Sequence, residues 1–195
     1  MWTLLLAANL ARLPSAADRY RREDGEPRAI RIRLLPELSL PQGGRTRPFV
    51  YVSKMTIDTD GAGDAWTRDP AGQPETSLRY PDRSSLDPAQ IPYFVLPLGF
   101  EGRHPGVRLG DVAAVIYRGR VAYAIYGDEG PPQKIGEGSI ALARALGIDA
   151  DPVVGGADEG VEFVVFPGSG DGSPLTPAEI KGRAARLLAQ AARPL

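Results

Sequence analysis

Short apolar or alternating runs, separated by turns rich in Gly and Pro, make up most of this chain. Runs of this length and pattern predict β-strands. They cover residues 29–35, 49–57, 92–98, 111–117, 120–126 and 161–166. Only Arg118 and Gly119 separate the fourth run from the fifth, which predicts a tight β-hairpin.

Two segments show the signals of α-helices. Residues 139–146 follow Ser139, a good N-cap, and stop at Gly147. The sequence Thr176-Pro177-Ala178-Glu179 has a capping-box pattern with Pro at the first helical position, which predicts a helix over residues 177–192. Its apolar stripe is a core-packing face. The stripe comprises Ile180, Ala184, Leu187, Leu188 and Ala191.

The first residues of the chain allow two interpretations. Residues 2–8 are apolar, as in a signal peptide, but no Lys or Arg precedes them and Asn9 ends the run early. We therefore expect a short helix at Trp2–Arg12, and this segment by itself leaves the localisation unknown. No run approaches the length of a membrane span, so we expect no membrane partner.

Six strands and only small helices predict a mainly β (or α+β) fold. We expect a compact six-stranded β-barrel, and a double-psi topology is one possible arrangement of its strands. A short helix would follow Glu137, and a second would end the chain. The Pro-rich segment 36–48 has little apolar material and is predicted to be a linker. We therefore expect an N-terminal extension and linker at 1–47 and a single domain at 48–195.

Composition narrows the chemistry. The 195 residues include no Cys, which excludes disulfides and thiolate chemistry. They include one His, His104, which we expect to be an exposed loop residue without a role. Residues 51–171 carry ten basic and eighteen acidic side chains, a net charge of −8, although the whole chain carries only −1. An acidic body disfavours nucleic acid and suits a cationic partner.

Two carboxylates could perform acid–base chemistry. Asp128 follows a predicted strand, Glu137 precedes a predicted helix between two glycines, and the loop Glu129–Gly136 joins them. Hydrolysis of a glycosidic bond needs such a pair, one to protonate the leaving oxygen and the other to activate water or attack the sugar. Spacing alone is weak support, because both residue types are common at turns and helix starts. Which carboxylate is the acid stays open.

A second acidic group lies at Asp58, Asp60 and Asp64. Its order resembles a calcium loop but lacks the later Glu that completes an EF-hand, so we expect no metal and no other cofactor. A plain turn is one interpretation. The functional alternative is a subsite that binds substrate ammonium groups, with Asp58 and Asp60 as the candidates.

Aromatic side chains could offer faces to sugars. The candidates are Trp66, Tyr93, Tyr123 and Tyr126. Strand alternation puts Tyr123 and Tyr126 on opposite faces, so at most one of them lines a substrate site, and we select Tyr126.

The segment YAIYGD (123–128) followed by IGEGSIALARALGI (135–148) resembles the active-site region of family 75 glycoside hydrolases, the fungal-type chitosanases. Three further stretches resemble bacterial members, and the likeness covers about residues 48–180. They are MTIDTDGAGDAW (55–66), IPYFVLPLG (91–99) with LGDVAAVIY (109–117), and VEFVVFPGSGDG (161–172).

The resemblance implies an inverting, endo-acting hydrolase of chitosan, the β-1,4-linked glucosamine polymer, with Asp128 and Glu137 as the essential pair. It also favours secretion, and we expect a monomer. Two alternatives remain: a carbohydrate-binding β-barrel without catalysis, and a hydrolase of another amino-sugar polymer such as peptidoglycan.

Overall fold

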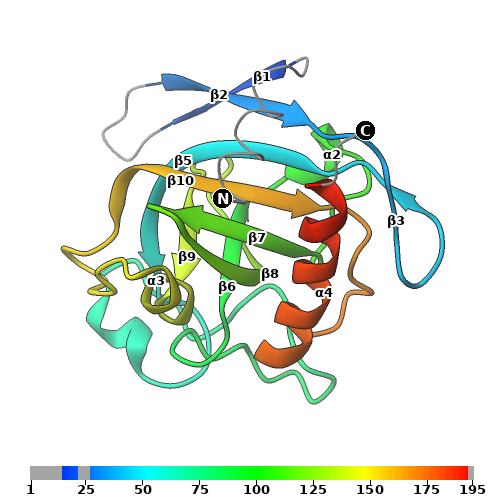
Figure 1. The fold of residues 1–195 in the computed structure, drawn as a ribbon. Helices are drawn as coiled ribbons and strands as arrows, with labels where there is room; N and C mark the ends of the chain where they lie inside the picture. The colour runs from blue at the N-terminus through cyan, green and yellow to red at the C-terminus, as the bar shows by residue number, and fades with distance from the viewer. Residues whose placement is uncertain (1–14, 22–26, 193–195) are drawn as a thin grey trace.

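The computed structural model describes residues 15–21 and 27–192, and the predicted helix Trp2–Arg12 lies outside this part (Figure 1). One eight-stranded sheet runs in the order β1-β2-β5-β10-β7-β8-β6-β9, and an additional pairing of β5 with β9 closes its last six strands into a barrel. These six are β5 (Phe49–Asp58), β6 (Tyr93–Pro97), β7 (Val112–Tyr117), β8 (Arg120–Gly130), β9 (Glu137–Ser139) and β10 (Ala157–Phe166).

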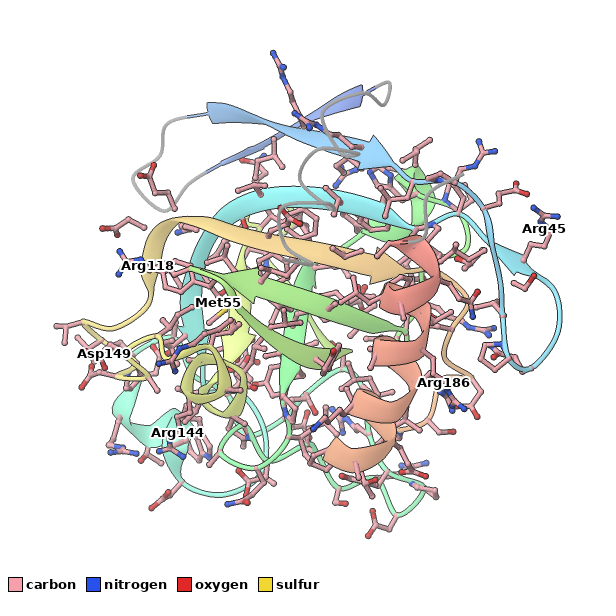
Figure 2. All side chains as sticks on the ribbon, viewed as in Figure 1. Arg45, Met55, Arg118, Arg144, Asp149 and Arg186 are labelled. Carbon is pink, nitrogen blue, oxygen red and sulfur yellow. The ribbon has the colours of Figure 1, made fainter. Side chains whose placement is uncertain are left out.

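The barrel mixes parallel and antiparallel pairs. β5 pairs parallel with β9, and β6 pairs parallel with β8, while the other four pairings of the ring are antiparallel. The mainly β fold and the six-stranded barrel are therefore confirmed, and the double-psi topology stays a prediction. The hairpin of β7 and β8 is also confirmed, with positive φ at Arg118 and Gly119, and Arg118 marks its tip in Figure 2.

Aromatic rings fill the inside of the barrel. Tyr51 stacks on Phe163 with ring centroids 4.8 Å apart, and Phe94 stacks on Tyr126 at 5.6 Å. Phe94 and Phe163, at 6.4 Å, belong to β6 and β10, which are not neighbours in the sheet. Their contact therefore crosses the interior. Residues that alternate with these rings, such as Val95, consequently lie on the outer face.

Helix α4 (Pro177–Ala191) covers part of that outer face beside β7 and β8 (Figure 1). Its capping box is formed as predicted, with Thr176 and Glu179 bonding reciprocally, and Ile180, Ala184 and Leu187 are buried. Helix α3 (Ile140–Leu146) starts at Ser139, whose side chain accepts a hydrogen bond from the backbone N–H of Leu142, as predicted. Helix α2 (Phe100–Arg103) and the 3-10 helix η1 (Ala65–Arg68) are single turns.

The N-terminal part adds strands outside the ring. β1 (Ser15–Arg21) pairs with β2 (Pro27–Leu34), and β2 pairs with β5, so the predicted strand at 29–35 extends the sheet without joining the barrel. Within the predicted linker, β3 (Leu38–Ser39) pairs with β4 (Arg45–Thr46).

That segment is therefore more ordered than a linker, and its Leu38 is buried in the same outer apolar cluster as residues of α4. The division of the chain at residues 47 and 48 stays a prediction. Among the helices in the described ranges, none has the length and apolar character needed to cross a membrane.

Candidate active site

Asp128 lies inside β8, which runs four residues further than the predicted strand. The pairing of β8 with β6 shifts register there, because Phe94 pairs with Tyr126 but the next residue, Val95, pairs with Asp128. Gly127 is the extra residue of this β-bulge. Without the bulge, Asp128 would share the inward face of Tyr126, two residues earlier; with it, Asp128 lies beside Val95 on the outer face.

Glu137 reaches the same face from another strand. It opens β9, a three-residue strand between β5 and β6, where it pairs with Thr56 on one side and Val95 on the other. The sequence predicts Glu137 after the loop Glu129–Gly136 and just before a helix, and the structure adds the short strand β9 directly before α3. Thr56, Glu137, Val95 and Asp128 thus form one row across four strands, named here the carboxylate row.

Glycines on both sides of Glu137 allow close packing within the protein. Gly136 has a φ of +92°, and a Cβ there would lie 2.3 Å from the carbonyl oxygen of Lys54. A Cβ on Gly138 would lie 3.1 Å from Sδ of Met55, which is buried inside the barrel (Figure 2). Gly136 thus adopts a torsion that favours glycine, and the two glycines bring the backbone close to β5 and to the core.

Asp128 is held by a residue that the sequence did not reveal. Its Oδ1 accepts hydrogen bonds from the backbone N–H of Ser77 at 2.8 Å, from the Ser77 hydroxyl at 2.6 Å and from the backbone N–H of Glu129 at 2.8 Å. Burial raises the pKa of Asp128, and these hydrogen bonds act in the opposite direction. Ser77 comes from the long polar connection between η1 and β6, and connections of such length without secondary structure are often functional.

The carboxyl groups of Asp58 and Asp60 lie next to Asp128. One oxygen from each of the three is within 4.8 Å of the others. Asp58 ends β5, and its Oδ1 accepts from the backbone N–H of Asp60 at 2.8 Å and from the Tyr93 hydroxyl at 3.1 Å. Asp60 accepts from the backbone N–H of Gln73 at 2.7 Å.

Crowding and burial keep these acids from ionising easily. The pKa of Asp58 is raised well above its usual range, first by burial and then by the charges of Asp60, Asp128 and Glu137. Burial, with a smaller effect from neighbouring acids, raises the pKa of Asp60 to about 6. Asp58, Asp128 and Glu137 have relative exposures of 8%, 5% and 7%. Such a set can bind a cation, either a metal ion through oxygen ligands or a substrate ammonium group.

A positive side chain faces Glu137. The ammonium Nζ of Lys134, on the loop between β8 and β9, lies 2.6 Å from Oε1 of Glu137, and the two side chains are 25% and 9% exposed. A hydrogen bond between two opposite charges at this distance belongs to the strong class. Lys134 was not a candidate in the sequence, where it is one polar residue in a Pro-rich loop.

Tyr126 is not part of this arrangement. It is fully buried inside the barrel against Phe94, so its ring has no face to offer a sugar, and the selection of Tyr126 as a substrate-binding residue is corrected here. Alternation predicted correctly that Tyr123 and Tyr126 lie on opposite faces, but the inward face belongs to the core. Tyr93 is also fully buried and serves to hold Asp58.

The structure also places Asp64 and His104, two further residues singled out in the sequence. Asp64 lies at the N-terminus of η1 and outside the group of carboxyls around Asp128. His104 is half-buried and not exposed, because its ring stacks on Phe100 with centroids 4.3 Å apart. Its place beside α2 is a packing role.

Buried paired carboxylates on the outside of a small β-barrel are suited to hydrolysis of a glycosidic bond. Comparison with known proteins is consistent with this geometry: residues 55–193 match the family described as "Fungal chitosanase of glycosyl hydrolase group 75". The match spans more than half of the chain, and the chain belongs to this family.

Two curated relatives carry the name endo-chitosanase C. One, from Aspergillus oryzae, is 32% identical over 125 residues, and the other, from Aspergillus oryzae (strain ATCC 42149 / RIB 40), is 31% identical over 129 residues. Each alignment covers 62% of this chain and 32% of the relative. The chain therefore spans about a third of the length of the relatives that it matches.

Proposed function

We propose that this chain is an endo-acting glycoside hydrolase that cleaves chitosan, with Asp128 and Glu137 as its catalytic pair and an inverting mechanism. The observation that carries the proposal is the carboxylate row, in which the two acids flank Val95 on one face of the barrel. Membership of the family and the name of the curated relatives support the activity and the substrate.

The position of the Glu137 carboxylate is compatible with inversion, which needs room for a water molecule between the two acids. A Cβ on Gly130 would lie 2.8 Å from Oε2 of Glu137. The side chain of Glu137 therefore extends from β9 past β6 and places its carboxylate over Gly130 of β8. Gly130 is two residues beyond Asp128 in β8, so the backbone positions of these two residues lie about 6.5 Å apart along the strand. Inverting pairs are roughly 6.5–9.5 Å apart, which leaves room for the attacking water.

The chemistry follows from that arrangement. One carboxylic acid donates its proton to the glycosidic oxygen, and the C1–O bond breaks. The other carboxylate takes a proton from a water molecule, whose oxygen bonds to C1 from the opposite side of the ring. Burial that raises the pKa of Asp128 is compatible with an acid role, and either assignment fits the geometry.

Negative charge around the pair suits an amino-sugar substrate. Asp58 and Asp60 lie beside Asp128 and would accept hydrogen bonds from the ammonium group of a glucosamine unit. The cation would also relieve the mutual repulsion of these acids, which is part of what raises the pKa of both. We propose Asp58 and Asp60 as binding residues and expect the chain to act as a monomer.

The test is release of reducing ends from chitosan, chitin and cellulose in parallel. Wild type should act on chitosan above the other two polymers, and Asp128→Asn and Glu137→Gln should each abolish release. Circular dichroism and melting curves must show that both variants remain folded. Full activity in either variant would remove that residue from the pair. Binding of chitosan without release of ends would instead indicate a carbohydrate-binding barrel, and release from peptidoglycan alone another polymer.

A further inference from the structure

The loop between β8 and β9 places a lysine against one oxygen of the Glu137 carboxylate. Lys134 contacts Oε1 at 2.6 Å, and its own backbone N–H donates to the carbonyl of Pro131 at 3.0 Å, which fixes the turn that presents it. At the far end of the loop, the carbonyl of Gly136 accepts from the backbone N–H of Thr56 at 2.9 Å. Lys134 is thus carried by a connection that is tied at its end to the barrel.

Gly130 leaves the space into which the other oxygen fits. A Cβ there would lie 2.8 Å from Oε2 of Glu137 and 3.1 Å from Cγ1 of Val95. The backbone of Gly130 is that of a strand residue and does not have the positive φ that favours glycine. A side chain at this position would therefore meet the Glu137 carboxylate and Val95 without straining the backbone.

We propose that Lys134 and Gly130 are positioning residues for Glu137. Lys134 fixes Oε1 and stabilises the negative charge, while the bare backbone of Gly130 lets Oε2 lie over β8, on the side of Asp128. Oε2 is then the atom that exchanges a proton with the substrate or with water. This inference rests on the proposed function and adds which oxygen of Glu137 reacts and what holds the other.

Other charges near Glu137 act against Lys134. Asp58 and Asp60, at the end of β5, both couple electrostatically to Glu137. These neighbouring acids disfavour a negative charge on Glu137, and the lysine favours it. Removal of the lysine should consequently raise the pH at which Glu137 loses its proton, because the neighbouring acids then act without the opposing charge of Lys134.

The first experiment exchanges the lysine. Lys134→Met keeps the length of the side chain and removes the charge, and Lys134→Arg keeps the charge. We expect kcat on chitosan to fall about ten- to hundredfold in Lys134→Met, with a smaller loss in Lys134→Arg. One limb of the pH profile should move up by about one unit in Lys134→Met only. Unchanged kcat and pH profile in Lys134→Met would overturn the role of the lysine.

A second measurement does not depend on activity. Carbon-13 NMR of the Glu137 carboxyl, assigned by its loss in Glu137→Gln, gives the titration midpoint in the wild type and in Lys134→Met. A higher midpoint in the variant supports the inference even if chitosan is not the substrate. Equal midpoints overturn it even in a protein that is an active chitosanase. The failure of the inference and the failure of the proposed function are thus distinguishable.

The third experiment adds a methyl group beneath Oε2. Gly130→Ala should lower kcat at least tenfold while KM changes less, because the misplaced atom reacts and does not bind. Gly182→Ala is the matched control, since Gly182 lies in α4 and a methyl group added there would meet no atom within 4 Å, so kcat should stay unchanged. Wild-type kcat in a folded Gly130→Ala protein would overturn the role of Gly130.

Discussion

Asp60→Asn should stabilise the folded protein at neutral pH while it weakens binding of a cationic substrate. The pKa of Asp60 is raised from 3.8 to about 6, chiefly by burial. A carboxyl whose pKa is raised on folding favours the folded state when it is protonated. That contribution is complete below about pH 4 and is lost as the pH rises through about 6. The asparagine of the variant carries no charge at any pH, and its side-chain oxygen can still accept from the backbone N–H of Gln73.

The expected gain in the free energy of unfolding follows from the shift in the pKa of Asp60. A rise of about two pH units corresponds to about 3 kcal/mol at pH 7, at 1.36 kcal/mol per unit. Asp60 is only partly buried, so solvent screening reduces this to about 1–2 kcal/mol. In a protein of this size, the gain corresponds to a rise in Tm of about 2–8 °C.

The assay is urea unfolding at pH 4 and at pH 7.5, together with KM for chitosan oligosaccharides. We expect a gain in the free energy of unfolding at pH 7.5, little change at pH 4, and a KM several-fold above that of the wild type. Asp82→Asn is the control, and it should lower the free energy of unfolding at pH 7.5. The reason is that hydrogen bonds from Ser84 lower the pKa of the exposed Asp82. A loss of stability in Asp60→Asn that is equal at both pH values would refute the reasoning.

Three further changes test other parts of the structure. Ser77→Ala removes one of three donors to Oδ1 of Asp128, a bond worth about 1.5–3 kcal/mol, so Tm should fall by about 3–12 °C and kcat/KM about tenfold or more; unaltered kinetics would contradict it. Salt raised from about 0.05 to about 0.5 M should increase KM for chitosan oligosaccharides, since screening weakens attraction to the acids; a constant KM would argue against charge recognition. Thr176→Ala removes the cap of α4 and should cost about 1 kcal/mol of stability, measured by urea unfolding, without a change in kcat; an equal stability would contradict the capping argument.

The strands and helices with strong local patterns could be predicted from the sequence. The hairpin at Arg118-Gly119, the N-cap at Ser139 and the capping box at Thr176 are formed by residues within a few positions of one another. Local sequence was not enough to select the members of the barrel. The strand predicted at 29–35 lies outside the ring, and its place in the ring of six is taken by β9, whose Glu-Gly-Ser sequence has no strand pattern.

The catalytic candidates were predicted, but their surroundings were not. Asp128 points outward only because a bulge at Gly127 interrupts the alternation of β8, and a bulge is specified by packing against β6. The same long-range effect explains Tyr126, whose inward face is set by Phe94. Ser77 is 51 positions from Asp128, and only the fold brings the two together.

The stereochemistry of the first product tests the central claim most directly. Proton NMR of fresh digests of chitosan oligosaccharides shows which anomer forms before mutarotation. The proposed inverting mechanism predicts that the α-anomer appears first with the wild type, and that Asp128→Asn and Glu137→Gln give no product. The β-anomer as the first product, or product from either variant, would contradict the account.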